Sequence, residues 1–372
     1  MGLCFRRDDI ARCQRFREPG YARMKVGLFD HVERAVDRPL ATQLDERLKF
    51  AVAAEAAGFY CLHVAEHHGT PLNMVPVPGV YLGAVARATT RLRLGPLVYL
   101  LPLYSPLRLI EEICMLDHLS HGRLDIGIGR GVSPFELNFH KVAHDKSRDI
   151  FMDAFACISA GLTSDTLNHK GPYFTYTNVP MALRPLQEPH PPFWYGSSNE
   201  IGAAWSGERG MHFTANGPTA LAKTNIAAYR AALAKGNGPP VPKPEFPGGT
   251  AIGLLRHIVV AETDAEARAI AGPAIAHHSA SLNYLRKTQV LTTGADPRAN
   301  IHRGATFEEW EQEGMAIAGS PATVWAKLEA QARELGINYL LSYLFFGAMT
   351  LEQALRSLEL FRAEVMPKLA VL

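Results

Sequence analysis

Three ionisable residues, Glu66, His67 and His68, stand together where an apolar run of the sequence ends. That run, residues 60–66, has the composition of a buried β-strand. A histidine at the end of a strand can accept or donate a proton near neutral pH. A structural, hydrogen-bonded histidine is the alternative, and so is a metal site, although no HxH motif or third ligand with a recognisable spacing accompanies it. We expect acid–base chemistry at His67 and no metal.

Two arginines, Arg130 and Arg148, could bind an anion. Arg130 follows a glycine-rich strand pattern, and Arg148 stands beside Ser147 at the start of a predicted helix. Guanidinium groups, a serine hydroxyl and a helix N-terminus together suit a phosphate dianion. The alternative is that both arginines are ordinary surface residues paired with neighbouring aspartates.

The strand before Arg130 has one apolar face and one face of small residues. Its alternation places Leu124, Ile126 and Ile128 on one side and Asp125, Gly127 and Gly129 on the other. In a parallel barrel the apolar face would meet the helices and the small face would point inward. We therefore expect Gly127 and Gly129 to leave space for a ligand at the mouth of the barrel.

Other candidates carry weaker signals. Ser197, Ser198 and Asn199 form a small polar start to the helix predicted at Glu200. Adjacent histidines at 277 and 278 lie within a predicted helix, where we expect a solvated face. Seven aromatic residues could line an apolar pocket or belong to the core: Tyr173, Phe174, Tyr176, Phe193, Trp194, Trp205 and Trp310.

The elements that must position these residues alternate between strands and helices. Strands are predicted at 25–29, 60–66, 92–99, 124–128, 192–197, 211–215, 253–261 and 338–345. Helices are predicted at 44–57, 79–88, 148–161, 200–208, 219–234, 264–287, 321–335 and 350–363, with another between Pro106 and Gly122. This alternation predicts an α/β fold, a TIM (β/α)8 barrel. Insertions at about 162–191 and 288–318 are long enough to build the site or its lid.

Composition restricts the class of protein. The 372 residues are 47% hydrophobic and 20% charged, as in an ordinary globular enzyme. A formal net charge of +2 gives no reason to expect nucleic acid or an anionic membrane as a partner. The five cysteines lack CxxC spacing, which favours reduced thiols and the cytoplasm. No apolar run reaches the length of a membrane-spanning helix.

The first 23 residues differ from the rest, because they contain six arginines and no apolar run of the secretory type. We expect a disordered leader or translation from an upstream start codon, with a basic targeting arm as the alternative. Residues 24–367 are then expected to form a single barrel domain.

From Met24 to about Pro367 the chain resembles the bacterial luciferase-like, flavin-dependent monooxygenases, among which the luciferase alpha subunit is a similar relative. The motifs that carry the resemblance are EHH at 66–68, the LP and SP of LVYLLPLYSPLR, LDHLSHGRLDIGIGRG, SR at 147–148, AAWSGERG at 203–210 and GSP at 319–321. The combination and order of these motifs are specific.

The resemblance implies a barrel that accepts reduced FMN from a separate NAD(P)H-dependent flavin reductase. The flavin would react with O2 to a C4a-hydroperoxide and insert one oxygen atom into a small, largely apolar organic substrate. Arg130 and Arg148 match the family's flavin-phosphate arginines, with Ser147 and Gly129 beside them, and His67 matches the luciferase catalytic histidine. The family also implies a homodimer.

Three further features follow from the resemblance. Residues Gly196, Ser197, Ser198 and Asn199 match a loop that touches the flavin. A non-proline cis peptide is expected near Leu97 and Val98, and the insertion at 288–318 matches a mobile lid that would exclude water.

Two departures from luciferase are visible. Gly129 replaces a reactive cysteine, and the loop after the fifth predicted strand reads GSSN, so light emission with a long-chain aldehyde is not expected. Two alternatives stay open: a hydride-transferring oxidoreductase that uses the deazaflavin F420, and a non-catalytic flavin-binding partner subunit.

Overall fold

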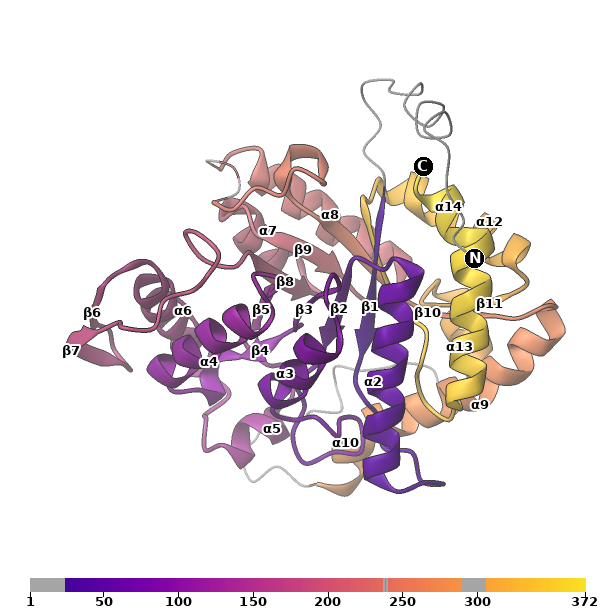
Figure 1. Ribbon diagram of the computed structural model, residues 1–372, viewed down its shortest axis with the longest axis horizontal. Coiled ribbons are helices and arrows are strands. Elements are labelled where there is room, and N and C mark those ends of the chain that lie inside the picture. The colour runs from indigo at the N-terminus through magenta and orange to yellow at the C-terminus, as the bar shows by residue number, and fades with distance from the viewer. Residues whose placement is uncertain (1–23, 237, 239, 290–305) are drawn as a thin grey trace, which may run out of the picture.

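The computed structural model describes residues 24–236, 238, 240–289 and 306–372, and its centre is a parallel sheet rolled into a barrel (Figure 1). The strands are β1 Lys25–Asp30, β2 Cys61–Val64, β3 Arg93–Pro96, β4 Tyr99–Leu100, β5 Ile126–Gly129, β8 Phe193–Ser197, β9 His212–Ala215, β10 Ile252–Val260 and β12 Tyr339–Tyr343. Their order is β3-β2-β1-β12-β10-β9-β8-β5-β4. An isolated bridge between Leu94 of β3 and Leu124, just before β5, brings the two ends of this order together. The predicted α/β, TIM-like fold is confirmed.

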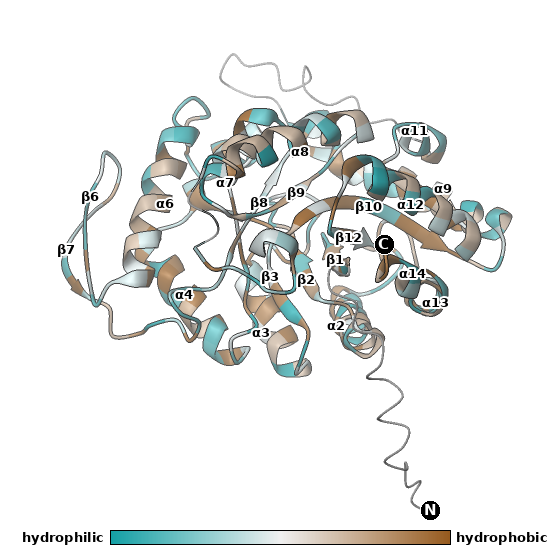
Figure 2. Cartoon of the chain, turned by 90° about the horizontal axis from the view of Figure 1, so that it is seen from above, coloured by the Kyte–Doolittle hydropathy of each residue, from teal (hydrophilic) through white to brown (hydrophobic). Residues whose placement is uncertain are grey.

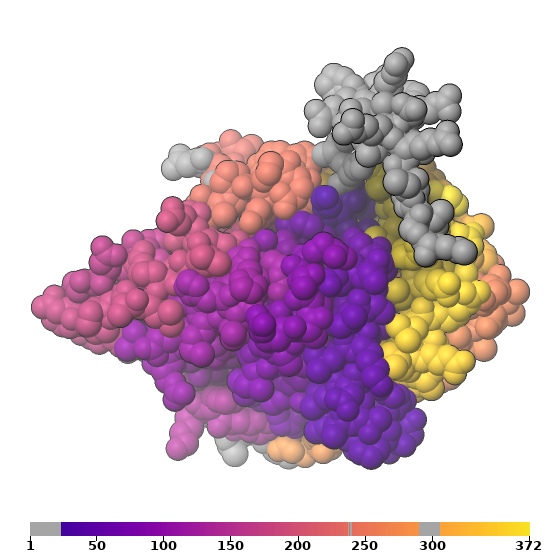
Figure 3. All heavy atoms as spheres, viewed as in Figure 1, coloured from indigo at the N-terminus to yellow at the C-terminus, as the bar shows by residue number. Residues whose placement is uncertain are grey.

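Helices cover the outside of this barrel. The larger ones are α2 Leu40–Ala57, α3 Pro78–Ala88, α4 Pro106–Leu119, α6 Ser147–Thr163, α7 Glu200–Glu208, α8 Thr219–Leu233, α9 Asp264–Leu282, α12 Pro321–Leu335 and α13 Leu351–Leu360, followed by a π-helical turn and the short α14 Met366–Leu369. Helices α2 and α13 pack against each other, so the early and late parts of the chain lie side by side (Figure 3). Hydrophobic residues run along most of β10, whereas polar residues gather on the helices outside (Figure 2).

The local signals for helix ends mostly hold. Gly58 adopts the left-handed conformation, with φ of 86°, and ends α2 as predicted. The helix predicted at 264–287 is broken, because α9 ends at Leu282 and a separate helix, α10 Tyr284–Thr288, follows Asn283. The predicted strand at 92–99 is likewise divided into β3 and β4. The peptide bond between Leu97 and Val98, which lies in that division, is cis, as the resemblance implied.

The small residues of β5 do not leave the space that the sequence led us to expect. A Cβ on Gly127 would meet the Pro96 carbonyl oxygen and lie 2.9 Å from the Leu97 Cα. A Cβ on Gly129 would meet the side chain of Val98. Neighbouring chain already fills this volume, so these glycines allow β5 to approach the cis peptide closely and do not hollow the mouth.

Large polar and aromatic side chains fill the interior of the barrel near the amino ends of the strands, and we call this group of residues the lower layer. His63, Asp125, Trp194, His212 and Tyr339 are all at most 2% exposed. His63 Nε2 and the Tyr339 hydroxyl are 2.9 Å apart, and the Ala251 amide donates to His212 Nδ1. Burial lowers the pKa of each of these histidines to about 4. The lower layer therefore closes the barrel at the amino ends of the strands, and the opening of the barrel lies at their carboxyl ends.

The two predicted insertions have different positions. Residues 162–191 contain an antiparallel hairpin, β6 Thr166–Lys170 and β7 Thr175–Pro180, which projects from the side of the molecule (Figures 1 and 3). Because this segment connects helix α6 to strand β8, it does not reach the carboxyl ends of the strands. The expectation that it builds the site is wrong.

The second insertion contains a strand that the sequence analysis missed. β11 Ala316–Gly319 pairs in parallel with the second half of β10, and α11 Phe307–Gln312 precedes it. Four small or apolar residues gave no periodic signal of a strand. The central part of the expected lid, 290–305, and the leader, 1–23, lie outside the described residues. No helix in the described ranges is long and apolar enough to cross a membrane.

Candidate functional site

A cavity of about 260 Å³ opens at the carboxyl ends of the barrel strands. It is the place where barrel enzymes carry their active sites. Nine residues proposed from the sequence line it: His67, Leu97, Val98, Gly129, Arg130, Gly196, Ser197, Ser198 and Asn199. Ser147 and Arg148 do not line it. The fold thus brings most of the proposed site together from the carboxyl ends of strands β2, β3, β5 and β8 and the residues that follow them.

One end of the cavity carries positive charge. Arg130 follows β5, and Arg148 lies in the first turn of α6. Both guanidinium groups act on the same neighbour, because each lowers the pKa of the Tyr195 hydroxyl, which burial raises. Within the described residues neither arginine forms a salt bridge, so the alternative of surface arginines paired with aspartates is not what the structure has. This end is suited to a dianionic group.

The hydroxyl and amide groups beside these arginines already have partners. Ser147 is buried and donates to the His144 carbonyl oxygen at 2.7 Å. Ser197 donates to the Asn199 carbonyl, and the Asn199 side chain accepts from the Gly202 amide as the N-cap of α7. The predicted polar helix start is confirmed. These groups shape the two helix starts, and the arginines supply the charge.

His67 faces the cavity from the end of β2 and forms a carboxylate–imidazole pair. Its Nδ1 lies 3.2 Å from Oε1 of Glu136, while Oε2 of Glu136 accepts from the His68 amide. Burial would raise the pKa of Glu136, but the charge of His67 and these hydrogen bonds hold it below its ordinary value. The ionised carboxylate fixes the orientation of the imidazole, which is the arrangement of an acid–base histidine.

Glu66 and His68, the other two residues of the EHH motif, hold the rim. Oε1 of Glu66 lies 2.8 Å from His68 Nε2, and Oε2 accepts from the Leu100 amide and the Tyr104 hydroxyl. Glu66 is 2% exposed and ties the end of β2 to β4. Its role is therefore to position the mouth.

Part of the cavity wall was not predicted from the sequence. His31, His257 and His278 line it together with Trp310, and the ring of His31 stacks on that of His67 with centroids 5.4 Å apart. The expectation of a solvated face at residues 277 and 278 is wrong for His278, which is 1% exposed. Its position next to the strands is set by the way α9 packs, which a two-residue pattern does not reveal. His31 directly follows β1, so the rule that picked out His67 could have found it.

Glu136 was also missed, although a signal for it exists. Ser133 and Glu136 have the spacing of a helix start, and Ser133 Oγ accepts from the Glu136 amide at the beginning of α5 Pro134–Phe139. A six-residue helix is shorter than the periodic patterns on which the assignment relied.

Of the seven aromatic candidates for the pocket, only Trp310 lines the cavity. Tyr173, Phe174 and Tyr176 belong to the projecting β6–β7 segment. Phe193 and Trp205 each pack on Phe155 of α6, and Trp194 lies in the packed lower layer. Of the two alternatives left open for these seven residues, a position in the cavity wall therefore holds for Trp310 alone.

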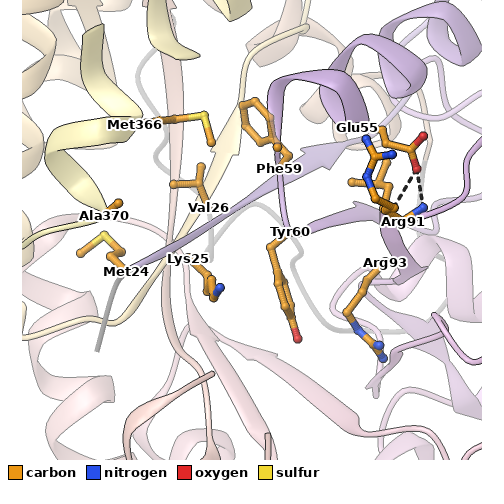
Figure 4. A pocket seen from close by; sticks show the side chains of 12 residues that line it. Met24, Lys25, Val26, Glu55, Phe59, Tyr60, Arg91, Arg93, Met366 and Ala370 are labelled. Carbon is orange, nitrogen blue, oxygen red and sulfur yellow. Dashed lines mark hydrogen bonds between the residues drawn. The ribbon is translucent and has the colours of Figure 1, made fainter. Parts of the chain in front are cut away.

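A second cavity, of about 550 Å³, lies at the opposite end of the strands (Figure 4). Its polar groups are engaged in structure, since one carboxylate oxygen of Glu55 accepts from the amides of residues 90–92 and Arg93 pairs with Asp125. We therefore place the functional site at the carboxyl ends. Across the described ranges, no group of three or more His, Cys, Asp or Glu side chains could hold a metal ion.

Comparison with known proteins agrees with this geometry. The family model described as luciferase-like monooxygenase matches residues 24–339. An uncharacterised protein, y4wF, of Sinorhizobium fredii is 33% identical over 93% of this chain and 98% of its own length. The oxygenase component of a flavin-dependent trigonelline monooxygenase of Acinetobacter baylyi is 25% identical over 92% of this chain and 95% of its own.

Solved structures share the fold. Monooxygenase RslO1 of Streptomyces bottropensis superposes with a TM-score of 0.81 at 23% identity, covering 93% of this chain and 99% of its own. The oxygenating constituent of 3,6-diketocamphane monooxygenase of Pseudomonas putida, in complex with FMN, gives 0.72 at 21%, covering 93% and 98%. An F420-dependent secondary alcohol dehydrogenase gives 0.70 at 17%, covering 93% and 99%. Proteins of this fold thus use FMN or F420. The chain belongs to the luciferase-like monooxygenase family, a family of oxidoreductases.

Proposed function

We propose that this protein is the oxygenase of a two-component system that uses reduced FMN and O2 to insert one oxygen atom into a small, largely apolar organic molecule. The observation that carries the proposal is Arg130, which lines the cavity beside Tyr195, together with Arg148, whose charge also lowers the pKa of the Tyr195 hydroxyl; neither arginine has a carboxylate partner among the described residues. One guanidinium group in the wall of a mouth cavity, with a second beyond that wall, would suit the terminal phosphate of FMN. Reduced FMN, when bound, supplies the electrons that activate O2.

The residues of this chain would divide the remaining work. Arg130 and Arg148 hold the phosphate, and the amide end of α6, shaped by Ser147, adds favourable dipole charge. The segment from Gly196 to Asn199, together with Gly129, lines the cavity and would border the cofactor from the ends of β8 and β5. Leu97 and Val98 line the cavity with apolar side chains that would contact the flavin.

His67 would hold and move protons near the reacting atoms. Glu136 keeps the imidazole in one orientation and stabilises its protonated form, so His67 can accept a proton and return it within one catalytic cycle. Positioned acid–base groups of this kind contribute on the order of 10²- to 10⁴-fold to a rate.

The partners follow from the same proposal. A separate NAD(P)H-dependent flavin reductase would supply reduced FMN, which the relative named as an oxygenase component supports. We expect a homodimer in the cytoplasm.

Oxygen uptake with photoreduced FMN tests this function against its alternative. We expect the purified protein, anaerobically loaded with photoreduced FMN, to consume O2 and form an oxygenated product from a panel of aldehydes, ketones, terpenes and phenols. His67→Ala should keep FMN binding and lose product. Reduction of F420 in place of oxygen uptake would assign the protein to hydride transfer, and failure to bind either cofactor would favour a non-catalytic subunit.

A further inference from the structure

His278, which lines the cavity, forms a second carboxylate–imidazole pair with Glu33, which lies behind the cavity wall. His278 Nδ1 lies 2.8 Å from Oε1 of Glu33, and both side chains are at most 1% exposed. Glu33 follows β1 and His278 lies on α9, so the pair joins two elements that are 245 residues apart in the chain. The first pair, His67 with Glu136, reaches the same cavity from β2 and α5.

Glu33 is held in its ionised form. The Tyr343 hydroxyl and the Gly347 amide both donate to Oε1, at 3.0 and 3.1 Å. Burial would raise the pKa of Glu33, but the charge and hydrogen bond of His278 and the Gly347 amide keep it below its ordinary value. A buried carboxylate of this kind fixes which nitrogen of its imidazole partner carries the proton and stabilises the imidazolium form.

The other ring nitrogen of His278 is available. Within the described part of the chain Nε2 makes no hydrogen bond, and His278 lines the cavity. In the neutral form of His278 that directs Nδ1–H to Glu33, Nε2 is the acceptor for a proton, and the protonated form is the one whose charge stabilises the Glu33 carboxylate. In the neutral form, Nε2 can therefore accept a hydrogen bond from an N–H or O–H group of a ligand in the cavity.

The surroundings define what that donor is. The rings of His257 and Trp310 lie 4.7 and 5.4 Å from that of His278, and the nearby wall is apolar: Phe29, Leu255, Leu282, Met315 and Leu341. The lining residues include no lysine, and their single arginine, Arg130, lies at the other end. A permanently anionic ligand group here would lie near the carboxylates of Glu33 and Glu136, and no lysine or arginine would neutralise its charge. A neutral hydroxyl on a flat apolar body fits both the base and the wall.

We propose that His278 accepts the proton of a substrate hydroxyl, and that the substrate class is a phenol or a stable enol. This inference rests on the proposed function, since it adds the polar group to the largely apolar substrate named there. The O–H bond of the substrate breaks, its proton forms a bond to Nε2, and the electron pair stays on the oxygen. Glu33 is a positioning residue that stabilises the imidazolium. The phenolate or enolate that results is electron-rich at carbon, and this is the form that reacts with an electrophilic oxygen donor.

p-Nitrophenol is a direct probe, because its phenolate absorbs visible light and its neutral form does not. We expect the wild-type protein, at a pH where the free phenol is mostly neutral, to bind it with a gain of the phenolate band. 4-Nitroanisole, which has the same ring and no acidic proton, should bind roughly tenfold or more weakly. Equal binding of the two compounds, or binding without the phenolate band, would overturn the proposal.

Variants then assign the effect to His278. Removing the imidazole alone leaves Glu33 buried and unpaired and can prevent folding, so the double variant Glu33→Gln/His278→Gln replaces the pair by two neutral amides. We expect it to lose the phenolate band and the preference over 4-nitroanisole. His277→Gln is the matched control, because His277 contacts the Arg34 carbonyl from the same helix and does not line the cavity. A double variant that keeps the band would also overturn the assignment.

Binding of reduced FMN, measured separately, distinguishes this inference from the proposed function. A protein that binds FMN and treats both nitro compounds alike retains the function and loses the inference. A protein that ionises p-nitrophenol but does not bind FMN retains the base and loses the proposed function.

Discussion

Two histidines buried at the bottom of the barrel make a pronounced loss of stability in mild acid a direct consequence of the fold. His63 and His212 are 0% and 2% exposed, and burial lowers the pKa of each from 6.5 to about 4. At pH 5 the folded protein keeps both imidazoles neutral, whereas the unfolded chain binds a proton at each. The free energy of unfolding must therefore fall as the pH drops from about 6.5 towards 4.

The size of the effect follows from these pKa values. Between pH 7 and pH 5 each histidine lowers the free energy of unfolding by about 2 kcal/mol, so the pair lowers it by about 4 kcal/mol. Asp30 acts in the opposite direction, because burial raises its pKa to about 6 and the folded state takes up a proton there first. Proton uptake at Asp30 raises the free energy of unfolding at pH 5 by about 1 kcal/mol. From these three groups the net expectation is a loss of about 2–3 kcal/mol.

Urea unfolding at both pH values measures this loss, provided that one transition is observed. His63→Gln isolates one contribution, since glutamine can keep the hydrogen bond to Tyr339 but does not titrate. The variant should lose about 2 kcal/mol less than the wild-type protein between pH 7 and pH 5. An equal loss in both proteins would refute the claim that His63 is buried in its neutral form.

Two further predictions concern the site. Gly127→Ala should lower the free energy of unfolding by at least about 1–3 kcal/mol in urea, because its Cβ would meet the backbone at Pro96 and Leu97; Gly83→Ala, in the middle of α3, is the control and should be neutral or stabilising by up to about 1 kcal/mol. Glu136→Gln should reduce product formation roughly tenfold or more, with the loss depending on pH and with reduced FMN binding unchanged, because only the orientation and charge support of His67 are lost. Equal stability of the two alanine variants, or full turnover at every pH in Glu136→Gln, would contradict these accounts.

The barrel and its charged end could be predicted from the sequence because their signals are local. Alternating apolar residues marked the strands, and Arg130 directly follows a strand whose end must lie at the mouth. His67 was found by the same reasoning. The clustering of these residues in one cavity then follows from the parallel arrangement of the strands.

The rest depends on contacts between distant segments. His278 reaches the cavity only because α9 packs so that its side chain meets Glu33, and two adjacent histidines in a helix carry no sign of that. The lack of side chains at Gly127 and Gly129 predicts open space for a ligand. In the structure the Pro96–Val98 segment packs into that space against β5. The β11 strand has only four residues and is defined by its pairing with β10.

The central claim, that Arg130 binds the phosphate of a reduced flavin, is tested most directly by comparing reduced FMN with reduced riboflavin. Riboflavin has the same ring and lacks the phosphate. We predict that Arg130→Ala weakens binding of reduced FMN roughly tenfold to hundredfold and leaves binding of reduced riboflavin within about twofold. If the substitution weakens both ligands equally, or neither, Arg130 does not bind the phosphate and the account is contradicted.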